Sequence, residues 1–186
     1  MELSKWKQPL NLDDTNTPIQ ALQLNFSLAY LLVDILYYAL FDSGDWFFMA
    51  HHLLSILYLG ASLHLGVGGI SAIFVFFMGE ITSPLFNVFS VAKTLKQDHV
   101  FASKVLNLVS PVFTFSFVLV RSVISPVLIG FFLKKLLFES PAIPAPYSVF
   151  MAFLVTCGMM GSQVWSYKLV KGYRKARAGA GRRKRD

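Results

Sequence analysis

The feature that most constrains this chain is a series of apolar segments, each about as long as a lipid bilayer is thick. Crossing a hydrocarbon core of about 30 Å takes about 20 helical residues. The segments that reach that length are residues 19–41, 46–65, 67–91, 104–132 and 147–170. Because a strand edge in lipid would leave backbone groups unpaired, we predict helices. The expected fold is an all-α membrane protein with about five transmembrane helices.

Composition and charge narrow the class of function. Charged residues make up 15% of the chain, whereas a soluble domain carries about 25%. Nine of the 17 lysines and arginines lie between Lys168 and Arg185, directly after an apolar segment. That position predicts an anchor on anionic lipid headgroups rather than a nucleic-acid site. The single cysteine, Cys157, excludes an internal disulfide, and no Cys/His spacing indicates a metal site, so no metal and no cofactor are expected.

The expected organisation has three parts. Residues 1–18 form a polar N-terminal segment, residues 19–175 a transmembrane domain, and residues 176–186 a basic, disordered cytoplasmic tail. Short turns at residues 42–45 and 65–69 predict antiparallel neighbouring helices.

The distribution of positive residues predicts the orientation. With five spans, the loop after the third span and the C-terminal tail lie on one side of the membrane. That side carries Lys93, Lys96, Lys104 and the nine C-terminal positive residues. Because positive residues accumulate on the cytoplasmic side, we expect the C-terminus to be cytoplasmic.

The fourth apolar segment, residues 104–132, contains Pro111, Arg121 and Pro126. A straight helix of that length would overrun the bilayer, since it rises about 1.5 Å per residue. We therefore expect a strong tilt or a kink near Pro126. Two separate spans are the less favoured alternative, because each half would be too short.

A few ionisable residues lie inside the predicted spans: Asp34, His51, His52, Glu80 and Arg121. Such groups are costly at bilayer depth and face the helix bundle or water. One interpretation is structural, with Arg121 pairing with Glu80 or Asp34 to fix helix packing. The functional alternative is a polar chamber lined by His51, His52, Glu80 and Arg121.

The two adjacent histidines begin a polar stripe, since His51, Ser55, Tyr58 and Ser62 share one helix face. Neighbouring residues on a helix point about 100° apart, so His51 and His52 cannot chelate one ion as an i, i+4 pair would. The functional interpretation is a general base or a proton relay. The structural alternative is a hydrogen-bonded pair packed against a neighbouring helix.

The face of Glu80 continues through Ser83, Pro84 and Asn87. Pro84 lacks an N–H and would leave the carbonyl of Glu80 without a helical donor, which suits a polar cavity. Near the end of the fifth segment, Gln163 is assigned to a belt of residues at the membrane interface.

Taken together, these residues resemble the TLC-domain family, a multi-span module shared by ceramide synthases and translocation-associated membrane proteins. The matching features are Tyr30 with Asp34, Asp45-Trp46, His51-His52, Glu80 with Ser83-Pro84 and Asn87, Arg121 with Pro126, and Gln163 with Trp165. The resemblance covers about residues 22–175. It implies a multi-pass protein of the endoplasmic reticulum, tied to lipid metabolism or membrane composition. Relative to the family, about two spans before the first one are expected to be absent, which would leave an incomplete barrel.

The resemblance also bears on catalysis. In ceramide synthases, a His-His pair and a later His-Asp motif line a chamber where an acyl chain passes from acyl-CoA to a sphingoid amine. His51 and His52 match the pair, but the later position reads Phe77-Met-Gly-Glu80, so Glu80 is the nearest carboxylate. This departure favours a non-synthase member of the family.

The leading functional hypothesis is a protein of lipid homeostasis that binds or senses lipid in an intramembrane polar cavity. The expected cavity residues are Asp34, Ser55, Asn87 and Arg121. The enzymatic alternative is an acyl-CoA-dependent N- or O-acyltransferase with catalytic residues His51, His52 and Glu80. A channel or transporter is the third class, although no inverted repeat supports it. Expected partners are membrane lipids, sphingolipid or acyl-CoA among them, and homo- or hetero-oligomers stay open, while no nucleic acid is expected.

Overall fold

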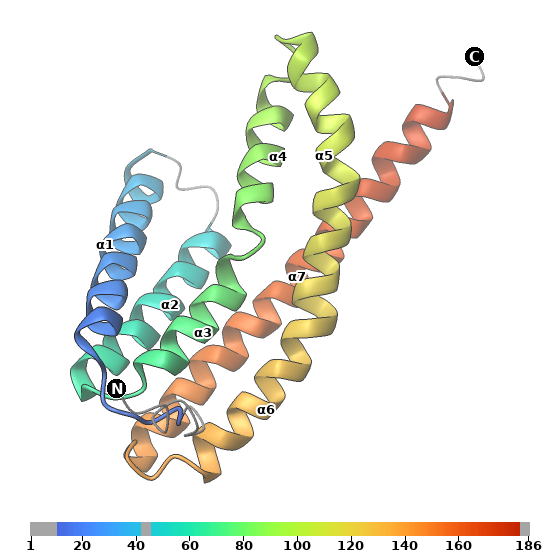
Figure 1. Ribbon diagram of the computed structural model, residues 1–186. Helices are drawn as coiled ribbons and strands as arrows, with labels where there is room; N and C mark the ends of the chain where they lie inside the picture. Colours follow the sequence, from blue (N-terminus) through green and yellow to red (C-terminus); the bar gives the residue numbers. More distant parts are fainter. Residues whose placement is uncertain (1–10, 42–45, 183–186) are drawn as a thin grey trace, which may run out of the picture. The chain divides into compact units, whose positions relative to one another are not determined.

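The computed structural model describes residues 11–41 and 46–182, with side chains as far as residue 177. The turn predicted at residues 42–45 lies outside the described residues. The helical elements are α1 (Pro18–Phe41), α2 (Trp46–Leu65), α3 (Gly69–Glu80), α4 (Ser83–Leu95), α5 (Val100–Val118), the π-helical η2 (Leu119–Ile124), α6 (Ser125–Phe138) and α7 (Ala145–Arg182) (Figure 1).

These elements form five candidate membrane spans. Within the described residues, the stretches long and apolar enough to cross a bilayer are 18–41, 46–65, 69–95, 100–138 and 145–177. The first two agree with the predicted segments to within a residue. The only strand-like contact in the described part is an isolated bridge between Thr15 and Val67. The all-α membrane fold with five spans is therefore confirmed.

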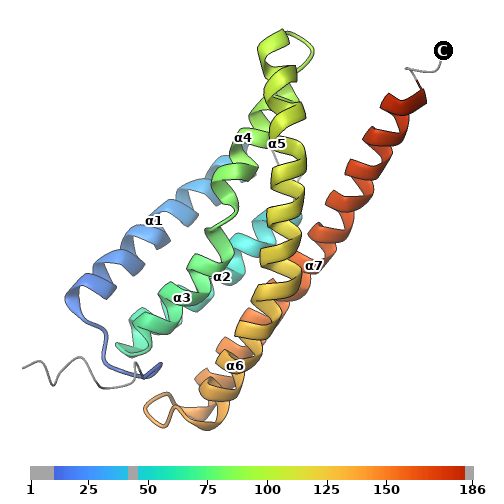
Figure 2. The same cartoon turned by 45° about the vertical axis from the view of Figure 1, so that its right-hand side comes forward.

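Prolines interrupt or distort the helices of the third and fourth spans. The third span is broken, because α3 ends at Glu80 and α4 begins at Ser83, with Pro84 in the first turn of α4. The fourth span runs without a break from α5 through η2 into α6 (Figure 2). The distortion at Pro126 takes the form of the π-helical segment directly before it.

The fifth span is longer than expected. Helix α7 continues to Arg182, so residues 176–182 are helical, whereas a disordered tail was expected from residue 176 onwards. Alanine, lysine and arginine favour the helix. Positive side chains near its C-terminal end also interact favourably with the helix dipole.

The chain divides into two compact units. Unit 1 comprises residues 1–76 and 129–158, and unit 2 comprises residues 77–128 and 159–186. The chain passes from one unit to the other inside α3, inside α6 and inside α7. Each unit therefore brings together segments that are distant in sequence.

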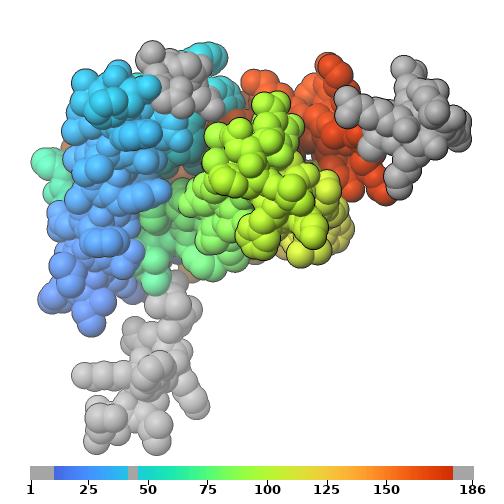
Figure 3. Space-filling model, turned by 90° about the horizontal axis from the view of Figure 1, so that it is seen from above, coloured from blue at the N-terminus to red at the C-terminus, as the bar shows by residue number. Residues whose placement is uncertain are grey.

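In unit 1, α1 has a buried stripe and an exposed one. Leu24, Ser27 and Leu31 are buried, and Asp34 continues their stripe at helical spacing. The opposite stripe consists of exposed apolar residues: Leu22, Phe26, Val33, Leu36 and Leu40. The space-filling view shows the side chains of α1, in blue, on the surface (Figure 3). A surface stripe of this kind suits contact with lipid and leaves Asp34 on the inward face.

Residues 11–17, the described part of the polar N-terminal segment, are built into unit 1. Asn16 donates through Nδ2 to the carbonyl of Ser62 (3.0 Å) and accepts through Oδ1 from the N–H of Gly69 (2.6 Å). Its own N–H donates to the carbonyl of Gly66 (2.8 Å). Gly66 and Gly68 have φ values of 67° and 78°, which glycine adopts without strain. Asn16 therefore fixes the turn between α2 and α3.

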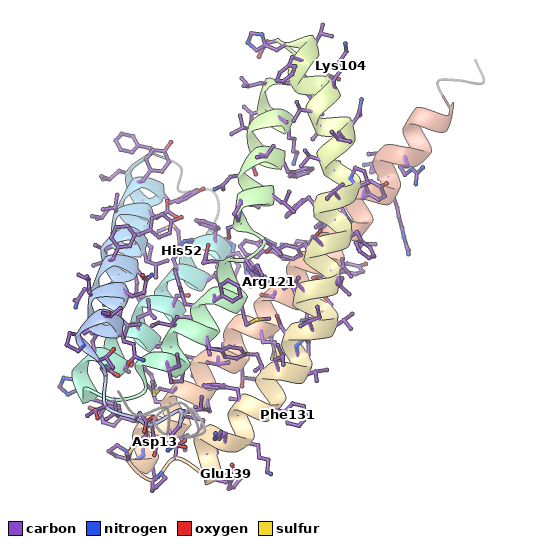
Figure 4. All side chains as sticks on the ribbon, in the orientation of Figure 1. Asp13, His52, Lys104, Arg121, Phe131 and Glu139 are labelled. Atoms are coloured by element: carbon purple, nitrogen blue, oxygen red, sulfur yellow. The ribbon has the colours of Figure 1, made fainter. Side chains whose placement is uncertain are left out.

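A second contact of this segment reaches the loop between α6 and α7. The N–H of Ala142 donates to Asp13 Oδ2 at 3.0 Å. Figure 4 labels Asp13 beside that loop. The segment before α1 thus joins two loops of unit 1 that are far apart in sequence.

In unit 2, α4 and α5 form an antiparallel pair joined by a short turn (Figure 1). The buried ring of Phe113 lies between aromatic neighbours. Its centroid is 5.8 Å from that of Phe86 on α4, 5.0 Å from that of Phe89 and 5.5 Å from that of Phe117. Apolar packing therefore fixes this pair, and the polar residues of the unit lie further along the fourth span.

Candidate functional site

The first polar centre joins α1 to α2 in unit 1. His52 Nε2 lies 3.1 Å from Asp34 Oδ2, and the two side chains are 4% and 25% exposed. We call this pair the Asp34–His52 centre. Figure 4 labels His52 on α2, beside α1. An acid and a base in contact inside apolar spans avoid the larger cost of a single buried charge.

The second nitrogen of His52 determines where its protons lie. His52 Nδ1 is 3.1 Å from the carbonyl oxygen of Phe48, which can only accept a hydrogen bond. Nδ1 therefore carries a proton. Nε2 then either donates to an ionised Asp34 or accepts from a protonated one. In both cases one proton is shared with Asp34, and both ring nitrogens of His52 are engaged.

His51 points elsewhere in unit 1. The rings of His51 and His52 have centroids 6.1 Å apart and planes at 85°. A Cβ added at Gly158 of α7 would lie 4.0 Å from His51 Nδ1. Ser55 donates to the carbonyl of His51 at 3.1 Å, a bond within α2. Among the described residues, no three His, Cys, Asp or Glu side chains come together as a metal site.

The second polar centre lies in unit 2 around Arg121, whose residue is 6% exposed. Nη1 donates to Ser162 Oγ at 3.2 Å, Nη2 donates to the carbonyl of Gly79, and the guanidinium lies 5.4 Å from the ring centroid of Phe117. One interpretation of the sequence paired Arg121 with Glu80 or Asp34. Among the described residues Arg121 interacts electrostatically with Glu80 but forms a close ion pair with neither acid. The break after α3 offers the backbone carbonyl of Gly79 instead, and Asp34 is paired with His52.

The π-helical segment explains a further contact. In η2 the N–H of Ser125 donates to the carbonyl of Val120, and Pro126 has no N–H. The carbonyl of Arg121 is therefore left without a backbone donor. Gln163 on α7 supplies one through Nε2 at 2.7 Å. π-helical turns inside longer helices occur frequently at functional sites.

Other hydroxyls complete this region of unit 2. Ser122 donates to Ser166 at 2.8 Å, which adds a third hydrogen bond between η2 and α7. Three buried polar atoms have no hydrogen-bond partner among the described residues: Thr114 Oγ1, Arg121 Nε and Ser125 Oγ. Buried polar groups are nearly always paired, so these three atoms require an explanation.

The remaining predicted site residues lie in unit 2. Glu80 is half-buried and interacts electrostatically with Arg121, whereas Asn87 is exposed. The structure therefore pairs the side chains of Asp34 and His52. Ser55 contacts the backbone carbonyl of His51, not its ring. The chamber that would join the histidines to Glu80 and Arg121 stays a prediction, because the two groups belong to different units.

Three contributors were missed at the level of sequence. Ser162 and Ser166 escaped notice because serines in an apolar helix are common, and the contact of Gln163 with the Arg121 carbonyl was not foreseen. The signal that could have identified Gln163 is Pro126, since a proline in a membrane helix leaves a carbonyl that another helix must satisfy.

Comparison with known proteins gives a consistent result. Residues 4–171 match the TLC domain, which covers most of the chain. A TLC domain-containing protein of Arabidopsis thaliana is 33% identical over 118 residues, which is 62% of this chain and 46% of that protein. The chain thus matches about half the length of that relative. No solved structure matches.

Proposed function

The chain belongs to the TLC domain family, and on that premise we propose that it binds a membrane lipid through its intramembrane polar residues. The proposed setting is the membrane of the endoplasmic reticulum, and the proposed role is lipid homeostasis without catalysis. Two observations support this proposal. The resemblance found in the sequence implies a family that handles lipids, and the exposed apolar stripe of α1 suits direct contact with lipid.

The observation that carries this proposal is the state of Asp34. Its Oδ2 is engaged by His52, and the side chain is 25% exposed, so the described residues do not fully enclose the carboxyl group. A carboxylate oxygen is a strong acceptor that can take more than one hydrogen bond. Within a membrane span, the donors that reach it belong to lipids or to water. Asp34 is thus suited to a lipid that offers a hydroxyl, an amide N–H or an amine.

His52 supports binding over catalysis. A general base needs a nitrogen directed at the proton that it removes. Both ring nitrogens of His52 are engaged, by Asp34 and by the carbonyl of Phe48. His52 therefore holds Asp34 in place, and the acyltransferase remains an alternative that a direct assay decides.

Lipid labelling tests the proposal. The protein would be placed in lipid nanodiscs with photoactivatable, clickable analogues of sphingosine, ceramide and diacylglycerol, each with and without its unlabelled form. We expect competed labelling by at least one analogue. Asp34→Leu should weaken it about tenfold, the magnitude of a hydrogen bond to a charged group. Asp98→Leu, which changes an exposed acid in the loop between α4 and α5, is the matched control.

The same preparation separates the alternatives. Labelling that no unlabelled lipid competes away, or that is equal in wild type and Asp34→Leu, would overturn the proposal. Incubation with labelled acyl-CoA and sphingoid or glycerol acceptors tests the enzyme. Acylated product that disappears in His51→Ala and His52→Ala would mean that the protein is an acyltransferase and not only a lipid-binding protein. Gel filtration of each variant checks that it remains folded.

The proposed orientation places the C-terminus in the cytoplasm. It is supported by the basic residues of unit 2, which follow the end of α4 and the last turns of α7. There Lys171 lies 6.0 Å from the ring centroid of Tyr167, and Arg177 lies 5.7 Å from that of Tyr173. Such a basic helix suits anionic headgroups. Protease protection of a C-terminal tag in sealed microsomes tests this, because a protected tag would reverse the orientation.

A further inference from the structure

Three helices carry the chain from one compact unit to the other. The crossings lie between residues 76 and 77 in α3, between residues 128 and 129 in α6, and between residues 158 and 159 in α7. A glycine lies at or close to each crossing: Gly79 in α3, Gly130 in α6 and Gly158 in α7. Gly60, in the middle of α2, offers a comparison because that helix belongs wholly to unit 1.

Close packing does not account for the glycines at the crossings. A Cβ added at Gly79 or Gly130 would meet no described atom within 4 Å, and one added at Gly158 would lie 4.0 Å from His51 Nδ1. An alanine would therefore fit at each crossing. It would also favour the regular helix, because glycine has more conformational freedom to lose. The property that glycine adds at these positions is an easier bend of the helix.

The helices are irregular near two of the crossings as well. α3 ends at Glu80, the residue after Gly79, and α4 begins only at Ser83. The π-helical η2 ends at Ile124, shortly before the crossing in α6. Sharp bends in helices occur at glycine, at proline and at π-helical turns. Recognised causes of helix bending thus lie close to the points where the chain changes unit.

The polar contacts between helices lie inside the units. The Asp34–His52 pair joins α1 to α2, and both helices belong to unit 1. The hydrogen bonds of Arg121 and Gln163 join segments of unit 2. A bend at the crossings therefore breaks none of these contacts.

We propose that Gly79, Gly130 and Gly158 form a hinge about which unit 1 and unit 2 move as separate bodies. The three helices bend at these glycines, while the packing inside each unit stays in place. Hinges consist of a few residues, often small ones, that absorb a change in backbone angles. The motion is a property of the fold and does not depend on lipid binding at Asp34.

Distances between spin labels test the hinge. In a Cys157→Ala background, labels on Val33→Cys of α1 and Leu108→Cys of α5 report on the two units together, and all the labelled positions are exposed. Labels on Val88→Cys of α4 and Leu108→Cys report on unit 2 alone. Double electron–electron resonance in nanodiscs should give several distance components for the first pair and one narrow component for the second.

The variants place a methyl group where it fits. Gly79→Ala, Gly130→Ala and Gly158→Ala should each reduce the minor distance components of the first pair about twofold to fivefold, because alanine favours the regular helix to that extent. Gly60→Ala, which also adds a methyl group with no described atom within 4 Å, is the matched control and should leave the distances unchanged.

Hydrogen–deuterium exchange of the unaltered protein gives a second measurement that needs no folded variant. Amides around Gly130 and Gly158 should exchange faster than those around Gly60, because local opening is easier where a helix bends. Exchange that is no faster at the crossings would contradict the hinge.

Two results of the distance measurement would overturn the hinge. In the first, the pair across the two units gives a distribution as narrow as that of the pair inside unit 2. In the second, the distribution is broad, but the variants at the crossings change it no more than Gly60→Ala does. Neither result bears on lipid labelling at Asp34, so the hinge and the proposed function can fail separately.

Discussion

The contact between Gln163 and the carbonyl of Arg121 leads to a prediction that depends on Pro126. The carbonyl of Arg121 has no backbone donor, because Ser125 donates to Val120 and Pro126 has no N–H. Gln163→Leu removes the side-chain donor and should destabilise the protein. In a Pro126→Ala background, an alanine N–H continues the i→i−5 pattern and reaches the same carbonyl. The effect of Gln163→Leu should then largely disappear.

The geometry sets the size of this effect. The bond from Gln163 to Arg121 is 2.7 Å long, and Gln163 is half-buried on α7. Leaving a buried acceptor unpaired costs about 1–3 kcal/mol. Couplings between hydrogen-bonded residues in membrane helices average about 0.6 kcal/mol and reach about 1.7 kcal/mol. Because no backbone donor can substitute here, we expect the upper part of that range, about 1.5 kcal/mol.

A double-mutant cycle measures it. Each variant would be heated in detergent, and the folded fraction would be followed by fluorescence-detected gel filtration. At about 2–4 °C per kcal/mol, Gln163→Leu should lower the melting temperature by about 3–6 °C in the wild-type background and by less than half of that with Pro126→Ala. Gln97→Leu, in the exposed loop between α4 and α5, is the control. Equal losses in both backgrounds would refute the reasoning.

Three further predictions concern unit 1. Asp34→Leu leaves His52 Nε2 buried without a partner and should lower the unfolding free energy by about 1–3 kcal/mol, while Asp34→Asn, which retains a hydrogen bond, should lose less in the same thermal assay. Asn16→Ala removes two side-chain hydrogen bonds that hold the turn between α2 and α3, so proteolysis at that turn should become faster. An unchanged cleavage rate would contradict the role of Asn16 in fixing the turn. Gly68→Ala places a side chain at φ 78° with a contact of 3.3 Å and should destabilise by about 1–2 kcal/mol, whereas Gly60→Ala, with nothing within 4 Å, should not.

Much of the fold could be predicted from the sequence because bilayer thickness alone sets the length of a span. The bounds of α1 and α2 were within a residue of those predicted. The end of α7 was missed because a run of lysine, arginine, alanine and glycine is typical of both a disordered tail and a helix, and composition does not separate them. The break before Ser83 had a visible cause in Pro84, which lies in the first turn of α4.

The candidate site was less predictable, because contacts between helices decide it. Asp34 was recognised as an inward-facing acid, yet the partner considered for it on sequence grounds was Arg121. The interhelical register of α1 and α2 brings His52 to 3.1 Å. For Arg121, the competing acceptor was the carbonyl of Gly79, which no residue type reveals. Backbone groups freed by helix irregularities are hidden from a sequence pattern, and the Gly79 carbonyl at the break after α3 belongs to that class.

The two polar centres differ in how their charge is balanced. Asp34 and His52 share one proton, so the pair is neutral overall in either protonation state. Arg121 donates hydrogen bonds to a hydroxyl and to a backbone carbonyl, and it interacts electrostatically with the carboxylate of Glu80 without forming an ion pair. Each arrangement lowers the cost of burying a charge inside an apolar span.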